Sequence, residues 1–448
     1  MLGLIHSPED LVPMLRIPLC LLLLSSAALA QTVVSVGESS GEGVQSADVS
    51  AATQLGVYSK LVADQMGAAH PLPLIISHPF GTVFSTFGRF RLDPNLHAHN
   101  LAISGADVTD VLEKVPTLPV DSETDLILSP YSGSQVEIAE SLSPDLTLCW
   151  VGNNDSLGAI LPFDQLDASQ LTSVSTFQTK FHEIAQRLSA ASDKVVFANL
   201  PNLTNIAFTF DAAELAEYAG SDFGLPAGYR TSLVTATALR TGLVDGSVLD
   251  DPNWVLDPTE IATIQQRIED FNQIIADEAA AVDAPVVDIA ALFDDIEQNG
   301  YNLFGLTLTN DFRGGVFSLD GVHPTNIGHA IIANEFIAKL NSHYSMSIPA
   351  LSPLQLALIL FTDPEIDKDG DGRVTGRAFA GLLETVAPAL GVSGDLNDFV
   401  ADAPFNLSQS NGKSFVRQVE GSAGLTSWGK TLQQRALSAS SRAFGSLE

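Results

Sequence analysis

The chain has 448 residues, of which 45% are hydrophobic and 17% are charged, and its formal net charge is −32 at pH 7. This length and composition predict a globular protein of two domains, one of them large. So acidic a surface repels phosphate backbones, which excludes nucleic acid as a natural partner.

The first 30 residues predict a cleavable secretory signal peptide. An apolar run, IPLCLLLLSSAALA, follows Arg16 and ends at Ala30 with small residues, as such leaders do. It is shorter than the ~20 apolar residues that span a bilayer, so we expect no transmembrane segment in the exported chain. Because Cys20 lies in the leader, only Cys149 remains, and no intrachain disulfide is expected. We expect secretion or periplasmic export; a buried N-terminal helix is the alternative.

Short apolar runs then alternate with longer stretches of helical period. This alternation is typical of βαβ units around a parallel sheet, whose strands are covered on both faces. Helices are expected between the strands, for example over 57–67 and 175–191. The predicted strands are residues 32–37, 99–104, 146–152, 194–200 and 284–290.

The segment 206–256 interrupts this alternation with Gly, Pro, Asp and aromatic residues, and we interpret it as a loop-rich insertion. A helix is predicted directly after it, because Asp257 and Glu260 flank a proline in a capping pattern. The last helical face of the large domain follows His323, and we expect this domain to end near residue 347.

Two segments carry residues suited to nucleophilic catalysis. Ser39 lies in a glycine-rich turn directly after the first predicted strand, where a hydroxyl is presented at a strand-to-helix junction. A serine needs a base to attack a carbonyl. Asp320 precedes His323 by three residues, so its carboxylate can hold the imidazole ring as a base. Taken alone, each segment is more often structural.

Two further segments can supply hydrogen-bond donors to an oxyanion. Asn154 follows the third predicted strand in the sequence GNND, and an uncharged amide there can stabilise a developing negative charge. Gly105 follows the second predicted strand and can offer an unobstructed backbone N–H. Either one alone has an ordinary turn as its alternative.

Together, the four segments resemble the SGNH (GDSL-type) hydrolases. In that family the named residues are Ser, Gly, Asn and His in this order, and here they match Ser39, Gly105, Asn154 and His323. The resemblance covers roughly residues 32–347. It departs from the usual G-D-S-L block, with Glu38 in place of Asp and a serine, a rival hydroxyl, in place of Leu.

The resemblance implies a flavodoxin-like, three-layer α/β/α fold and hydrolysis of carboxylic esters. Ser39 would be the nucleophile, His323 the base and Asp320 the residue that orients it. The oxyanion would be bound by the N–H groups of Ser39 and Gly105 and by the side-chain amide of Asn154. No metal or organic cofactor is implied for catalysis, and the substrate is a lipid, sugar or small soluble ester.

Three other functions compete with this interpretation. The string GESSG also satisfies the G-x-S-x-G turn of α/β-hydrolases, but that fold places several strands before its nucleophile. A zinc hydrolase is disfavoured because HEIAQ at His182 lacks a second histidine. A non-catalytic binding or surface protein on an SGNH scaffold remains the alternative, and Glu38 motivates it.

Residues 351–448 predict a helical C-terminal module with a Ser-, Ala- and Gly-rich tail. The loop 367–378 has the spacing of an EF-hand or dockerin-like calcium site, but position 12, normally a bidentate Glu, is Ala378. A solvated acidic turn is the alternative, and the sequence names no partner for the module. The candidate calcium ligands are Asp367, Asp369, Asp371 and Thr375.

Overall fold

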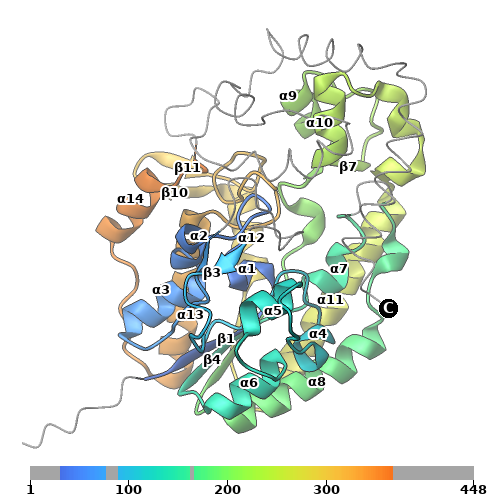
Figure 1. The fold of residues 1–448 in the computed structure, drawn as a ribbon. Helices are drawn as coiled ribbons and strands as arrows, with labels where there is room; N and C mark the ends of the chain where they lie inside the picture. Colours follow the sequence, from blue (N-terminus) through green and yellow to red (C-terminus); the bar gives the residue numbers. More distant parts are fainter. Residues whose placement is uncertain (1–30, 77–88, 162–165, 367–448) are drawn as a thin grey trace, which may run out of the picture. The chain divides into compact units, whose positions relative to one another are not determined.

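The computed structural model describes residues 31–76, 89–161 and 166–366 (Figure 1). The predicted signal peptide and the predicted calcium loop 367–378 lie outside the described residues. Within the described ranges, no helix combines the length and the apolar character needed to cross a membrane.

A four-stranded parallel sheet forms the centre of the fold, with the strand order β1-β4-β5-β9. Its strands are β1 (Val33–Gly37), β4 (Leu146–Trp150), β5 (Val195–Ala198) and β9 (Val286–Val287). Every residue of the first three is buried, because helices cover both faces of the sheet. The predicted parallel α/β fold is therefore confirmed.

The predicted strand 99–104 forms only a single bridge, between Asn100 and Ser35 of β1. Its backbone follows the free edge of β1, since Leu101 N–H donates to Ser35 and Ile103 N–H donates to Gly37. The Asn100 side chain accepts from Ser35 Oγ and donates to the carbonyl of Gly41. The apolar run therefore lines the sheet without extending it as a regular strand.

Helices form a layer on each side of the sheet (Figure 1). On one side, α3 (Tyr58–Met66) packs against α13 (Asn326–Tyr344). On the other, α8 (Val174–Ala191) packs between α6 (Gln135–Leu142) and α11 (Pro258–Ala281). The predicted start of α11 is confirmed, because Asp257 and Glu260 form a capping box there.

The insertion is more regular than predicted. Its segments β6 (Thr209–Phe210), β7 (Arg230–Ser232) and β8 (Val255–Leu256) form an antiparallel sheet in the order β6-β7-β8. Two helices, α9 (Ala212–Ala219) and α10 (Leu233–Thr241), complete it. Strands of two or three residues are too short to leave a periodic pattern in the sequence.

One more helix, α14 (Pro353–Thr362), follows α13. Its residues Leu356 and Leu360 are buried in the same hydrophobic core as α13. Asp363 at its end accepts a hydrogen bond from the backbone N–H of Ile327, in the first turn of α13. The division of the chain near residue 347 stays a prediction, but the chain just beyond it packs on the core of the large domain.

Candidate active site

Ser39 begins the short helix α1 (Ser39–Glu42), directly after β1. Glu38 caps this helix, because its carboxylate accepts the backbone N–H of Ser40 at 3.3 Å. The preceding Gly37 cannot be replaced without movement, since a Cβ there would lie 2.4 Å from the carbonyl oxygen of Trp150. The strand thus turns tightly into the helix and holds Ser39 at the carboxyl edge of the sheet.

Asp320 and His323 form a tightly held pair in the loop before α13. The distance from His323 Nδ1 to Asp320 Oδ2 is 2.7 Å. The backbone N–H groups of Val322 and His323 donate to Asp320 Oδ1 at 2.8 and 2.9 Å. Gly321 makes this turn feasible, because its φ is +73° and a Cβ would lie 2.7 Å from the nitrogen of Phe208.

The electrostatics of this pair suit a catalytic base. Burial alone would raise the pKa of Asp320, but the charge and hydrogen bond of His323 outweigh it and lower that pKa to about 2. For His323, burial lowers the pKa, but the charges of Asp320 and Glu38 and the bond to Asp320 raise it overall. Because Asp320 is ionised, we assign the proton to Nδ1 of His323, which leaves Nε2 as the basic atom.

The Ser39 hydroxyl donates to Glu38 Oε2 at 2.7 Å. Among the described residues, no hydrogen bond joins Ser39 to His323. The sequence did not reveal this contact, because it depends on the conformation of the Glu38 side chain.

The predicted oxyanion donors come from adjacent loops. Gly105 is exposed, with a φ of +80°, and no atom lies within 4 Å of a Cβ built there. Asn154, which is half-buried, donates its amide to the carbonyl of Ala106 at 2.9 Å. The two predicted segments are therefore in direct contact, and one N–H of the Asn154 amide is engaged.

Two positioning contacts were missed from the sequence. Asn153, the neighbour of the predicted amide, donates to Glu38 Oε1 at 3.1 Å. Buried Glu42, in the nucleophile helix, accepts both the backbone N–H and the hydroxyl of Ser104 at 2.6 Å. These bonds tie the nucleophile helix to both oxyanion loops. The only sequence signal for Asn153 and Glu42 is that they lie within the GNND and GESSGE motifs.

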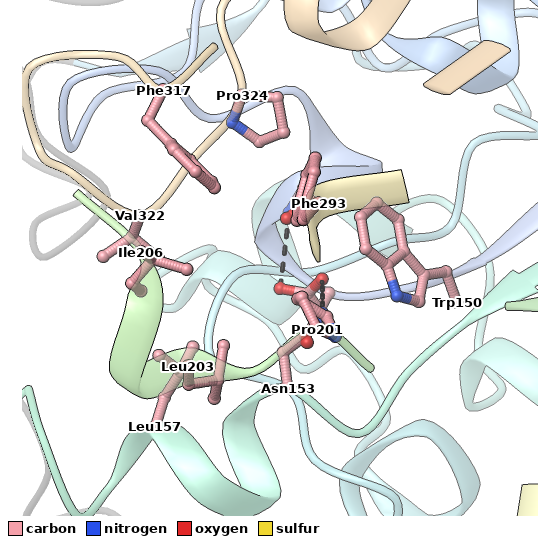
Figure 2. Close-up of a pocket in the computed structure, with 12 residues that line it drawn as sticks. Trp150, Asn153, Leu157, Pro201, Leu203, Ile206, Phe293, Phe317, Val322 and Pro324 are labelled. Atoms are coloured by element: carbon pink, nitrogen blue, oxygen red, sulfur yellow. Dashed lines mark hydrogen bonds between the residues drawn. The ribbon is translucent and has the colours of Figure 1, made fainter. Parts of the chain in front are cut away.

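A small cavity of about 20 Å³ lies between the nucleophile and histidine loops (Figure 2). This is room for about one water molecule. Its walls are largely apolar, and the amide of Asn153, one of its lining residues, donates to the carboxylate of Glu38, which is another. The residues beside Ser39 and His323 that line it are Glu38, Ser40, Val322 and Pro324.

A metal site needs several His, Cys, Asp or Glu side chains close together. In the part of the chain that the structure describes, no three such residues lie close enough to hold an ion. The candidate calcium ligands Asp367, Asp369, Asp371 and Thr375 fall outside that part, so calcium binding stays a prediction.

A parallel sheet between two helical layers, with polar side chains at the carboxyl ends of its strands, is the predicted three-layer α/β/α fold. The model of the GDSL-like lipase/acylhydrolase family matches residues 33–336. The chain therefore belongs to this family, and the protein is an ester hydrolase by family.

No curated protein matches the chain. Among solved structures, it is similar to an alpha/beta hydrolase enzyme from the metagenome of Lake Arreo, Spain, at 14% identity and a TM-score of 0.36, over 69% of this chain and 94% of that one. It is also similar to an acetylxylan esterase from Geobacillus stearothermophilus, at 13% identity and a TM-score of 0.35, over 70% and 95%.

Proposed function

We propose that the protein is an exported serine hydrolase that cleaves carboxylic esters through an acyl-enzyme. The observation that carries this proposal is the bond between buried Asp320 and half-buried His323, which leaves Nε2 of the imidazole to take a proton. Ser39 stands between Glu38 and Ser40, which line the cavity that Val322 and Pro324, the neighbours of His323, also line. A nucleophile, a base and a group that orients the base form the minimal set for acyl transfer.

In the first half-reaction, the Ser39 hydroxyl leaves Glu38 and turns to Nε2 of His323. Its proton passes to Nε2 while Oγ bonds to the ester carbonyl carbon. The resulting oxyanion accepts from the N–H groups of Ser39 and Gly105 and from the Asn154 amide. The ester bond to the alcohol then breaks, and the alkoxide leaves with the proton from Nε2.

In the second half-reaction, a water molecule gives a proton to Nε2 and attacks the acyl carbon. The bond from the acyl carbon to Oγ breaks, Ser39 takes the proton back, and the carboxylic acid departs. No metal or organic cofactor takes part in this scheme. Export by the predicted leader belongs to the proposal, and mass spectrometry of the exported protein should find an N-terminus at or near Gln31.

The alternative function is a non-catalytic binding or surface protein on the same scaffold. One observation favours it: the Ser39 hydroxyl donates to Glu38 rather than to His323. A series of chromogenic esters of increasing acyl length, assayed on the purified exported protein and on Ser39→Ala, separates the two functions. Turnover that disappears in Ser39→Ala supports the esterase, and no turnover of any ester by the parent protein supports the binding protein.

A further inference from the structure

The chain that follows α14 returns to the loop that holds Asp320. Asp363 is fully buried and accepts the N–H of Glu365 at 3.0 Å, while its other oxygen accepts the N–H of Ile327 at 3.0 Å. Glu365 is itself only 6% exposed. This short segment is thereby fixed against the start of α13, beyond the residues that the family model matches.

Glu365 contacts a two-residue bridge, Ser46-Ala47, that leads to the catalytic carboxylate. Ser46 Oγ donates to Glu365 Oε2 at 2.6 Å and accepts the N–H of Leu319 at 3.1 Å. The backbone N–H of Ala47 donates to Asp320 Oδ2 at 2.8 Å. This oxygen is the one that also accepts from His323 Nδ1.

The bridge holds an unfavourable backbone conformation. Ser46 and Ala47 have φ values of +52° and +61°, in the left-handed region that residues with a Cβ seldom adopt. Such a conformation persists only where its surroundings determine it. Three hydrogen bonds of Ser46 hold this conformation. Its hydroxyl bonds to Glu365 and to the N–H of Leu319, and its own N–H donates to Ser318 Oγ at 2.9 Å.

We propose that Glu365 is a positioning residue for the catalytic pair, which it orients through Ser46, Ala47 and Asp320. This inference rests on the proposed function. Without the Glu365 carboxyl group, the bridge loses a bond that keeps it left-handed, and the Ala47 N–H moves away from Asp320 Oδ2. The Asp320 carboxylate is then less fixed, and so is the imidazole ring of His323 that it orients.

The test compares Glu365→Ala, Glu365→Gln and Ser46→Ala with the parent protein. Glu335→Ala is the matched control, because Glu335 is exposed on the neighbouring helix α13. We expect Glu365→Ala and Ser46→Ala to lower kcat by roughly 10- to 100-fold, because misplacement by an ångström costs up to ~10²-fold. KM should change by less than about threefold, since both side chains are buried and neither lines the cavity.

Glu365→Gln keeps an acceptor oxygen for Ser46 and should retain kcat within a few-fold. Circular dichroism and melting curves identify the variants that are folded at the assay temperature. A folded Glu365→Ala or Ser46→Ala with the kcat of the parent would overturn the proposal. So would a loss in Glu365→Gln as large as that in a folded Glu365→Ala.

A readout that is independent of turnover separates this proposal from the proposed function. The proton between His323 Nδ1 and Asp320 can be followed by NMR in the parent and in each variant. We expect its signal to shift or broaden in Glu365→Ala and to stay in place in Glu365→Gln and Glu335→Ala. An unchanged signal in Glu365→Ala contradicts the positioning role even if no ester is hydrolysed. If the parent protein is inactive but the signal shifts in Glu365→Ala, only the proposed function is contradicted.

Discussion

The hydroxyl of Ser39 donates to the carboxylate of Glu38, with 2.7 Å between Oγ and Oε2. Glu38 is thus the resting partner of the predicted nucleophile, and two other groups fix its carboxylate: the amide of Asn153 and the N–H of Ser40. The same negative charge contributes to the raised pKa of His323. Glu38 therefore acts on both the nucleophile and its base.

The first prediction concerns Glu38→Gln and the acid limb of kcat/KM. His323 must be neutral to accept a proton, so activity falls as the pH drops below its pKa. Removing the charge of Glu38 takes away one of the influences that raise this pKa, so the acid limb should move to lower pH. His329, whose pKa burial lowers to about 3, stays neutral throughout, and Asp320 stays ionised.

Glu38→Asp is the control for this experiment, because it keeps the charge and changes only the reach of the side chain. Its acid limb should stay within a few tenths of a pH unit of the parent. A Glu38→Gln profile that superimposes on that of the parent would show that Glu38 does not influence His323.

The second prediction concerns the catalytic unit. Ser39→Ala, His323→Ala and the double variant should lose activity to about the same extent, ~10⁴–10⁶-fold in turnover, because nucleophile and base act together. Asp320→Asn should lose less than these, since it misorients the imidazole without removing it. Ser40→Ala should stay within a few-fold of the parent. A fluorophosphonate probe that labels Ser40 instead of Ser39 would refute the assignment.

The third prediction distinguishes two adjacent amides. Asn154→Ala should lower kcat by ~10²–10³-fold, because it removes one oxyanion donor. Asn153→Ala should cost less, because Asn153 contacts Glu38 and acts only through it. Steady-state kinetics on one chromogenic ester suffice for both variants. The reverse order of losses would transfer the oxyanion role to Asn153.

Sequence patterns predicted the elements whose structure depends on residues close together in the chain. The apolar runs of β1, β4 and β5 and the capping box at Asp257 were readable because each follows from local chemistry. The segment 99–104 has the apolar composition of a strand. In the structure, however, the side chain of Asn100 bonds to two groups far away in the sequence, the hydroxyl of Ser35 and the carbonyl of Gly41. Composition does not register such a bond.

The candidate site shows the same division. Asp320 and His323 are three residues apart, which puts the carboxylate within reach of the imidazole, and the structure has this contact at 2.7 Å. The contact of Glu365 with Ser46 joins residues separated by 319 positions, and no pattern in a single sequence encodes it. The choice between Asn153 and Asn154 depends on how a turn points its side chains, which only the three-dimensional structure decides.

The fourth prediction concerns calcium. Asp367, Asp369 and Asp371 supply oxygens, but Ala378 cannot supply the bidentate carboxylate at position 12. We therefore expect weak binding, with a dissociation constant on the order of 10⁻⁴–10⁻³ M. Millimolar calcium should raise the melting temperature of the exported protein relative to chelator, while ester turnover stays the same. Identical melting curves in the two conditions would contradict this prediction.

The fifth prediction uses the buried carboxyl of Asp155, which accepts the N–H of Val108 at 3.1 Å. Burial, and then the charge of Asp107, raise the pKa of Asp155 to about 8. The folded chain thus keeps a proton that the unfolded chain releases near pH 4. Between pH 4 and 8 the folded state binds more protons, so this residue makes the free energy of unfolding fall as pH rises, by up to ~1.4 kcal/mol per pH unit.

Asp155→Asn removes that proton uptake and keeps an acceptor oxygen for Val108. Urea unfolding should therefore show that the variant loses less stability than the parent between pH 5 and pH 8. Asp222→Asn, at an exposed turn, is the control and should follow the pH dependence of the parent. Equal losses for Asp155→Asn and the parent would mean that Asp155 is ionised in the folded protein at neutral pH, with a cation or water compensating its charge.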